Sequence, residues 1–396
     1  MKISDIIAGT KTRRHRSSRK QRHVQPDDNL YTVDTQHLAE GPSEARIPHV
    51  EDHAIWDGVA GGKKAIATIA SLAKQPTRAT IKWDGSPAVI FGRNEAGEFV
   101  LTDKSGFGAS GYDGRVTNAK DLEKMFLSRG KEAPDAKRKA FARNMRNVWD
   151  KFEAAVPEDF RGYVAGDLLY YNTPALVDGR LDFTPNTTRY SVDPDSEIGR
   201  QIAQSTTGVV LHKSIGLDGS VGPVDVSVFN PGKLLVIPPA VVTQAPKINL
   251  KGLESLNKYL TPDIDQMLSP PAELKMKNFR DMIYNYVNNK TKAGTLDTLG
   301  QDFPEWVQAN DKISAGKKQR VIDYIMQHKK AFAKLFKFMT AIMDIKEKII
   351  DELDQQEADV VAYTDGKRGG EGYVVGGDSK LVNRRTFTAA NMNRER

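Results

Sequence analysis

The pattern of hydrophobic residues changes twice along the chain, and this constrains the fold more than any other feature of the sequence. Up to about residue 248, short apolar runs bounded by glycine and polar turn residues predict strands. From about residue 250 to 356, apolar residues recur at intervals of three and four, which predicts helices. Strand character returns after residue 370. We therefore expect an α+β fold with a helical insertion, in which the last hairpin rejoins the first sheet.

These patterns divide the chain into four segments. Residues 1–47 are polar and lack a sustained period, so we expect a disordered basic N-terminal arm. Residues 48–248 are predicted to form the first part of the core, and residues 249–358 the helical insertion. Residues 359–396 are predicted to complete the core with a strand, a Gly-Gly-Asp-Ser turn and a second strand.

The net charge of +7 comes from one short run of basic residues. Residues 11–22 hold seven Lys or Arg and no acid, and the remaining chain has 51 basic and 51 acidic residues. Such an arm binds phosphates without reading a base sequence, so nucleic acid is the expected partner. A solvated tail is the alternative interpretation.

The composition excludes several classes of protein. No apolar run approaches the roughly 18 residues of a membrane span, and the first residues do not resemble a secretory signal. The chain has no cysteine, which excludes disulfides, thiolate catalysis and cysteine-bound zinc. We expect a cytoplasmic protein without membrane partners.

Residues 80–93, TIKWDGSPAVIFGR, are the first stretch whose residues suggest chemistry. Two apolar runs flank Asp84-Gly85, which predicts a β-hairpin with its turn there, within a strand meander over residues 80–104. On such a rigid strand end Lys82 would be partly desolvated, which lowers the pKa of an amine and makes it a nucleophile. Gly85 would let a phosphate approach closely. Taken alone, K-x-D-G favours a plain hairpin turn.

Three charged residues downstream also stand at or near apolar strands. Asp167 lies within YVAGDLLY, Glu371 precedes the apolar residues of EGYVV, and Lys380 enters the partner strand of the last hairpin. Two carboxylates and two lysines suit nucleotidyl transfer, in which a lysine attacks an α-phosphate, carboxylates hold Mg²⁺ and a second cation stabilises developing charge. Singly, each carboxylate favours a structural role, so the hypothesis depends on their joint occurrence.

These stretches resemble, in order, the motifs of the covalent nucleotidyltransferases, the superfamily of ATP-dependent DNA ligases, RNA ligases and mRNA-capping guanylyltransferases. KWDG resembles motif I, and DKSGFG is similar to the element that follows it. GYVAGDLLY resembles motif III, and GVVLH stands where motif IIIa would. EGYVV resembles motif IV of phage RNA ligases, and SKLVNRR stands at motif V. The resemblance covers about residues 82–385, apart from the helical insertion.

The resemblance implies a role for each matching residue. Lys82 would form a lysyl-AMP intermediate with ATP, and Lys380 would contact the α-phosphate. Asp167 and Glu371 would hold the metal, Mg²⁺ or Mn²⁺. The implied nucleotide-binding residues are Ile81, Lys82, Asp84, Gly85, Arg93, Lys104, Asp167, Glu371 and Lys380.

The sequence departs from the motifs in several places. Asp167 replaces the usual Glu, and Ser-Pro follows K-x-D-G where Arg is usual, with Arg93 as a candidate substitute. Val382 interrupts the usual K-x-K of motif V, which leaves Arg384 or Arg385 as substitutes. Eleven residues follow Arg385, so no C-terminal OB-fold is expected.

We therefore predict an ATP-dependent polynucleotide ligase of RNA-ligase type, which seals 5′-phosphate to 3′-hydroxyl ends. RNA is favoured over DNA as its substrate, and the resemblance implies a bacteriophage protein of nucleic acid repair, active in the host cytoplasm. The alternative is a non-catalytic nucleic-acid-binding or virion-associated protein on the same fold. A third interpretation is an α+β protein of another role in which the motifs are coincidental.

Overall fold

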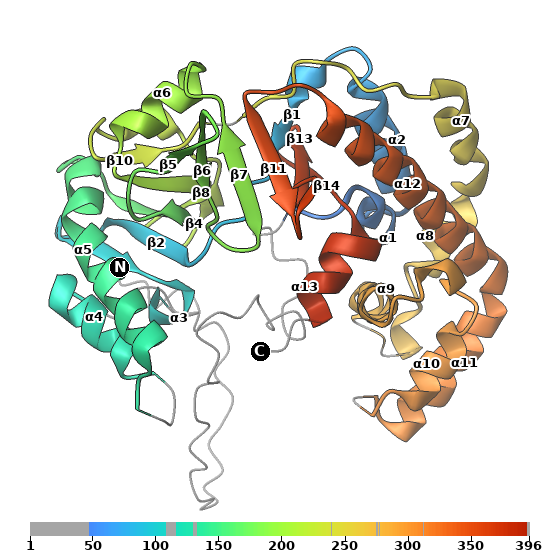
Figure 1. Cartoon of the computed structure of the whole chain (residues 1–396). Helices are drawn as coiled ribbons and strands as arrows, with labels where there is room; N and C mark the ends of the chain where they lie inside the picture. The colour runs from blue at the N-terminus through green and yellow to red at the C-terminus, as the bar shows by residue number, and fades with distance from the viewer. Residues whose placement is uncertain are drawn as a thin grey trace, which may run out of the picture. The chain divides into compact units, whose positions relative to one another are not determined.

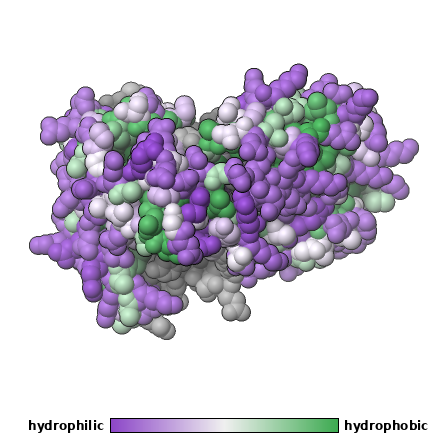
Figure 2. Space-filling model, turned by 45° about the horizontal axis from the view of Figure 1, so that its top comes forward, coloured by the Kyte–Doolittle hydropathy of each residue, from purple (hydrophilic) through white to green (hydrophobic). Residues whose placement is uncertain are grey.

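The computed structural model describes residues 47–107, 116–129, 133–238, 240–274, 276, 278–311 and 313–393. They combine antiparallel sheets with helices, which confirms the α+β class. The predicted basic arm lies outside the described residues, apart from residue 47. In the described part of the chain, no helix is both long and apolar enough to span a membrane. Figure 2 shows hydrophilic residues over most of the face in view, with hydrophobic residues in smaller areas.

The chain divides into two compact units. Among the described residues, the first unit comprises those of Asp84–Pro238 and is here called the sheet unit. The second, here called the helical unit, comprises the described residues of Val33–Trp83 and Pro239–Glu395, so the first boundary falls inside the K-W-D-G stretch. The predicted division at residues 248 and 358 stays a prediction, and helices α7 to α12 lie within its helical segment.

A six-stranded sheet organises the sheet unit (Figure 1). Its strand order is β10-β8-β4-β2-β3, with β9 paired to β8; β8 and β10 run parallel, and the other pairs are antiparallel. The strands are β2 (Ala88–Arg93), β3 (Phe99–Thr102), β4 (Gly162–Tyr170), β8 (Thr207–Ile215), β9 (Val221–Gly222) and β10 (Leu234–Val236). A separate antiparallel run comprises β5 (Ala175–Val177), β6 (Arg180–Phe183) and β7 (Thr188–Val192).

Helices cover one face of the six-stranded sheet, and successive side chains along each strand point alternately to the two faces. Val89 and Phe91 of β2 point into a core that α4 (Ala119–Leu127) and α5 (Ala136–Ala155) complete, and the ring of Phe91 meets that of Phe152 edge to face at 4.8 Å. Ile90, between them, joins a smaller cluster on the other face with Tyr163. The unit also contains α3 (Lys104–Phe107) and α6 (Glu197–Gln204).

The helical unit holds a three-stranded antiparallel sheet of order β1-β13-β14. Its strands are β1 (Ala79–Ile81), β13 (Gly372–Val375) and β14 (Ser379–Val382), and a short hairpin comprises β11 (Val360–Thr364) and β12 (Lys367–Arg368). The helices are α1 (His53–Trp56), α2 (Gly58–Ser71), α7 (Leu250–Glu254), α8 (Pro262–Met267), α9 (Phe279–Ala293), α10 (Phe303–Ala309), α11 (Ala315–Gln327), α12 (Lys329–Gln355) and α13 (Ala389–Asn393). A π-helical turn, Arg384–Thr388, precedes α13.

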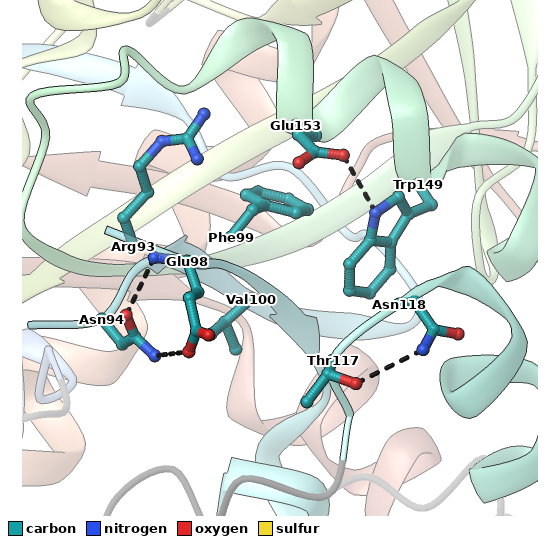
Figure 3. Close-up of a pocket in the computed structure, with 9 residues that line it drawn as sticks. All are labelled: Arg93, Asn94, Glu98, Phe99, Val100, Thr117, Asn118, Trp149 and Glu153. Atoms are coloured by element: carbon teal, nitrogen blue, oxygen red, sulfur yellow. Dashed lines mark hydrogen bonds between the residues drawn. The ribbon is translucent and has the colours of Figure 1, made fainter. Parts of the chain in front are cut away.

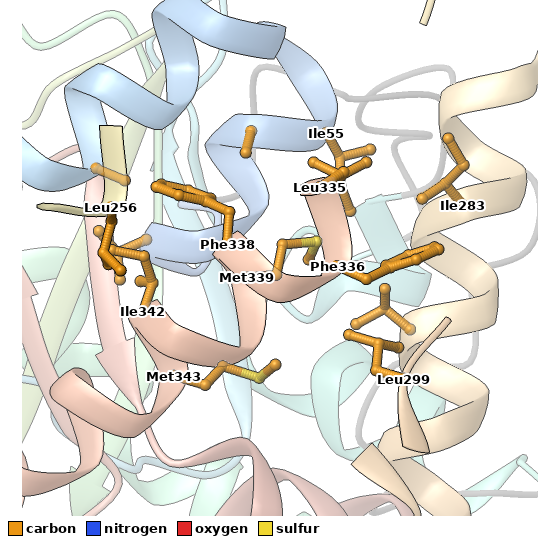
Figure 4. Close-up of a cluster of buried hydrophobic side chains, with 14 of the residues drawn as sticks. Ile55, Leu256, Ile283, Leu299, Leu335, Phe336, Phe338, Met339, Ile342 and Met343 are labelled. Carbon is orange, nitrogen blue, oxygen red and sulfur yellow. The ribbon is translucent and has the colours of Figure 1, made fainter. Parts of the chain in front are cut away.

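The long helix α12 is the centre of the core of this unit. Its apolar residues at three- and four-residue intervals are buried, which confirms the predicted pattern: Phe332, Leu335, Phe336, Met339, Ile342, Met343, Ile349, Ile350 and Leu353. Figure 4 shows Leu335, Phe336, Met339, Ile342 and Met343 of this set in one cluster with Ile55 of α1, Ile283 of α9, Leu256 and Leu299. The last hairpin is expected to rejoin the first sheet, over residues 80–104. It pairs with β1 of that region, whereas β2 and β3 belong to a different sheet.

The hairpin expected over residues 80–93 is wrong. β1 pairs with β13, whereas β2 pairs with β3 and β4, so the two runs belong to different sheets. After Gly85 the chain joins β4, because Ser86 N–H donates to the carbonyl of Leu168 at 2.9 Å. Local alternation identifies both runs as strands, but it does not reveal a partner some 290 residues away.

A cluster of four charged side chains is buried inside the helical unit. The Glu51 carboxylate accepts hydrogen bonds from Lys346 Nζ at 2.7 and 2.8 Å and from Arg384 Nε at 2.7 Å. Arg384 also donates to Asp52, and all four side chains are at most 1% exposed. Burial raises the pKa of Asp52 to about 6, with the charge of Glu51 adding to this and Arg384 opposing it.

Replacing Lys346 by Met should destabilise the helical unit by about 3–5 kcal/mol, because it leaves buried carboxylates without one of their cations. The matched control is Lys348→Met, two residues along α12 and exposed, which should change stability little. Urea unfolding of both variants measures the difference. Equal stabilities would show that the cluster contributes little.

Asp354 of α12 predicts a pH dependence of stability. It accepts a hydrogen bond from Tyr373 Oη at 2.8 Å, and burial raises its pKa to about 6. A carboxyl whose pKa is raised on folding contributes stability below its unfolded pKa of about 4, and this is lost as pH rises through 6. Asp354→Asn should therefore gain stability relative to the wild type between pH 4 and 7, measured by urea unfolding.

The same substitution at exposed Asp323 is the control for Asp354→Asn, and should leave the pH dependence of the wild type. An Asp354→Asn variant whose stability runs parallel to that of the wild type over this pH range would contradict the assignment.

Candidate functional site

One face of the β1-β13-β14 sheet carries two of the lysines singled out by the sequence. Thr80 lies opposite Val374, which in turn lies opposite Lys380. Lys82 continues β1, and its N–H donates to the carbonyl of Gly372 at 2.9 Å. Because side chains alternate along a strand, Lys82 and Lys380 leave the sheet on the same side.

The opposite side of this sheet packs into the core. Ala79, Tyr373, Val375 and Leu381 occupy the alternate positions and are buried in the cluster around α12. This explains why the two lysines stay on the partly exposed face: the other face is filled by apolar side chains, where an ammonium would be desolvated.

Glu371 lies immediately before β13 and pairs with Lys82. Lys82 Nζ donates to Glu371 Oε2 at 2.5 Å, and the two side chains are 25% and 16% exposed. Gly372 has a φ of +133°, and a Cβ there would lie 2.1 Å from the carbonyl oxygen of Leu381. A glycine is thus required next to Glu371, where β13 and β14 approach closely.

Lys380 shares the electrostatic environment of this pair. The pKa of Lys380 is lowered to about 8, first by burial and then by the positive charge of Lys82, whereas Glu371 opposes the change. The backbone N–H of Lys380 donates to the carbonyl of Pro48 at 2.9 Å, and His49 forms an isolated parallel β-bridge with Lys380. The structure thus brings together Lys82, Glu371 and Lys380, whereas Ile81, opposite Tyr373, packs against the core on the other face of the sheet.

Asp84 is a buried structural clamp of the sheet unit. Its carboxylate accepts hydrogen bonds from Asn186 Nδ2 at 2.9 Å and from Thr187 Oγ1 at 2.7 Å, and from Thr188 at 3.3 Å. Its N–H donates to Tyr190 Oη. These contacts join the segment after Lys82 to the start of β7, and they show what the Asp of K-W-D-G does in the fold.

Asp167 lies in the middle of the sheet unit, on β4. It is opposite Ala88, and its Oδ2 is 2.9 Å from His212 Nε2. His212 stands at a register shift between β4 and β8 and lies two residues from Val210, the partner of Asp167, so alternation places both side chains on one face. A Cβ on Gly85 would be 2.5 Å from the Cβ of Asp167, so Gly85 is needed for this approach. The sequence analysis did not assign His212 a role, since the local sequence does not reveal the register of β8 against β4.

Arg93 and Lys104 lie elsewhere in the sheet unit. Arg93 donates to the carbonyl oxygens of Val156, Pro157 and Gly97, at 2.9–3.1 Å. It lines a pocket of about 430 Å³ with Asn94, Glu98, Phe99, Val100, Thr117, Asn118, Trp149 and Glu153 (Figure 3). Asp84, Gly85 and Asp167 are not among the residues that line this pocket. Lys104 begins α3.

Neither of the two arginines that could replace the second basic residue of motif V points to the site of Lys82, Glu371 and Lys380. Arg384 is fully buried against Glu51 and Asp52. Arg385 pairs with Asp344 at 2.9 Å and Glu347 at 2.8 Å. Arginines are drawn into such carboxylate pairs because their fork geometry matches two oxygens.

No group of three or more acidic, histidine or cysteine side chains within the described ranges is arranged as a ready metal site. Glu371 and Asp167, the predicted metal ligands, belong to different units. Their carboxylate oxygens are nevertheless of the kind that Mg²⁺ prefers.

The fold and the site define an α+β protein with a lysine–carboxylate cluster on a small antiparallel sheet. Residues 45–396 match the model of a family described as a family of unknown function, DUF6267, and the chain belongs to this family. No curated protein and no solved structure matches the chain.

Replacing Asp84 by Ala should destabilise the sheet unit by about 3 kcal/mol, because several buried donors lose a charged acceptor at once. Asp84→Asn should recover part of this loss, since one amide oxygen remains. The control is Asp178→Asn on an exposed turn, which should change little. Urea unfolding distinguishes them, and an Asp84→Ala variant as stable as the wild type would contradict the clamp.

Proposed function

We propose that this protein is an ATP-dependent polynucleotide ligase of RNA-ligase type, which acts through a lysyl-AMP intermediate. The observation that carries the proposal is the grouping of Lys82, Glu371 and Lys380 on neighbouring strands of one sheet. The sequence separates these residues by almost 300 positions, and they match motifs I, IV and V. Their proximity was not implied by the local pattern of any one of them.

In the first step, Lys82 Nζ attacks the α-phosphorus of ATP, the bond to the β-phosphate breaks and pyrophosphate leaves. The attacking amine must give up a proton, and Glu371 Oε2 at 2.5 Å is an acceptor within reach. The AMP then passes from the lysine to a 5′-phosphate end. Finally, a 3′-hydroxyl displaces AMP and seals the strand.

Lys380 supplies positive charge during these steps. With its pKa at about 8, it is mostly protonated at pH 7 and can stabilise the negative charge that develops around the α-phosphate. Its partial burial strengthens such an interaction, since a low-dielectric environment screens it less than water. Above pH 8 this charge is lost.

Mg²⁺ or Mn²⁺ would neutralise phosphate charge when bound with ATP. The resemblance implies Glu371 and Asp167 as its ligands, and within the helical unit Glu371 is the carboxylate that we propose for it. Asp167 is a methylene shorter than the Glu usual in motif III, and it is already paired with His212.

The arrangement of the motifs on strands also supports the proposal. The stretches that resemble motifs III and IIIa are neighbouring strands, β4 and β8. Those that resemble motifs IV and V are the neighbouring strands β13 and β14, and motif I follows β1, the partner of β13. We propose that the two units carry the motifs of a nucleotidyltransferase, with motifs III and IIIa in the sheet unit and Lys82 and motifs IV and V in the helical unit.

The test is covalent labelling of the full chain with α-labelled ATP and Mg²⁺, followed by denaturation. We expect label on the wild type and none on Lys82→Ala, because the acceptor amine is absent. Lys380→Ala should label about 10²–10³-fold more slowly, as expected for loss of a group that stabilises the transition state. Lys63→Ala, at an exposed position of α2, is the matched control and should label normally.

An unlabelled wild type, or label that survives Lys82→Ala, would refute the lysyl-AMP intermediate. Substituting α-labelled GTP distinguishes a ligase from a capping enzyme. Ligation of nicked RNA and nicked DNA duplexes then identifies the preferred strand.

A non-catalytic nucleic-acid-binding or virion-associated protein is the second candidate. It is favoured by the ion pairs of both metal ligands that the resemblance implies, Glu371 with Lys82 and Asp167 with His212. For this candidate we expect no covalent label, and salt-sensitive binding that is lost on deleting residues 11–22 and unaffected by Lys82→Ala.

A further inference from the structure

The buried charge cluster of Glu51, Asp52, Lys346 and Arg384 has no role in the reaction described above. Removing each of these ions from water costs several kcal/mol, and well-packed apolar residues often give equal or greater stability. A contribution to the stability of the core therefore does not explain why these four charged side chains are buried together. Its position in the fold does suggest a role, because it lies next to the strand that carries Lys380.

The cluster connects two segments that fix the position of Lys380: the turn after Pro48 and His49, and the end of β14. Glu51 and Asp52 belong to a short 3-10 turn that directly follows Pro48 and His49. The carbonyl of Pro48 accepts the Lys380 N–H at 2.9 Å, and His49 bridges to the same residue. Arg384, four residues after Lys380, donates to Glu51 and Asp52 and thereby ties the end of β14 to that turn.

The remaining contacts hold Arg384 in one orientation. Its third hydrogen bond goes to Asn288 Oδ1 of α9 at 3.0 Å, and Glu51 is held from the opposite side by Lys346 of α12. A planar guanidinium with three acceptors cannot rotate without breaking several charge-assisted hydrogen bonds. The backbone of β14 at Lys380 is thus anchored to two long helices.

We propose that this cluster positions Lys380, so that Arg384, through Glu51 and Asp52, fixes the ammonium on the face of the sheet where Lys82 and Glu371 lie. This inference rests on the proposed function and adds positioning residues to it. Arg384 takes the place of a second phosphate-contacting residue of motif V in sequence, but it acts here through Lys380.

The charges of the cluster also affect the pKa of Lys380. The groups that affect its pKa after burial are Lys82, Glu371, Arg384 and Asp52, and Asp52 acts to raise it. Above pH 6 most of the Asp52 carboxyl is ionised, so it supports the protonated form of Lys380 at pH 7–8. Removing this negative charge should lower the pKa of Lys380.

The first test is a cycle of variants in the ATP-labelling reaction. Arg384→Lys keeps the charge and loses the fork, and should slow labelling at saturating ATP by between about ten- and a hundred-fold, with little change in the KM for ATP. Combined with Lys380→Ala, it should add no further loss, because it acts through that residue. If the double variant instead loses the product of the two single losses in labelling rate, the proposal is overturned.

The second test does not depend on nucleotide chemistry. The pH dependence of the reaction of Lys380 with an amine-acylating reagent, read by mass spectrometry, reports its deprotonated fraction. In the near-isosteric Asp52→Asn variant the midpoint should move to lower pH. Asp57→Asn, an exposed position five residues further on, is the matched control and should behave as the wild type.

These outcomes separate the two proposals. A wild type that takes no label from ATP refutes the proposed function, and the positioning of Lys380 is then decided by the acylation midpoints alone. If the midpoint of Lys380 is the same in Asp52→Asn and Asp57→Asn, the cluster does not act on Lys380. Should Arg384→Lys fail to fold, Asp52→Asn provides the deciding measurement.

Discussion

The pairing of β1 with β13 is the contact on which the candidate site depends. It joins residues near position 80 to residues near position 373 by main-chain hydrogen bonds, and these bring Lys82 next to Glu371. Without this pairing neither residue would have its neighbour, because nothing else in the local sequence of either holds them together. The cost in chain entropy of so long a closure is moderate, since it grows only with the logarithm of loop length.

The K-W-D-G stretch serves two units at once. Lys82 belongs to the helical unit, whereas Asp84 is buried in the sheet unit and holds the residues before β7. The aspartate and glycine of the stretch thus have structural reasons to be present. Gly85 is needed because Asp167 lies too close for a side chain, and Asp84 because several donors converge on it.

Much of the secondary structure could be predicted from the sequence, since it follows from local periodicity. The buried positions of α12 and the last hairpin with its Gly-Gly-Asp turn are examples. The partners of the strands could not be predicted in this way: the alternation in residues 79–93 fits a hairpin as well as two separate sheets. Lys82, Glu371 and Lys380 could be selected by motif order, whereas the register that brings His212 to Asp167 and the burial of Arg384 depend on tertiary contacts.

The long-range closure of the three-stranded sheet has a consequence for biosynthesis. During translation the sheet unit, residues 84–238, is complete long before β13 and β14 emerge, and domains generally fold as units in the order of synthesis. β1 can bond to residues 240–242 once these are made, but its pairing with β13 needs nearly 300 further residues. Lys82 therefore acquires its carboxylate only after residue 371 has been made, and until then the nascent chain carries the lysine without its ion-pair partner.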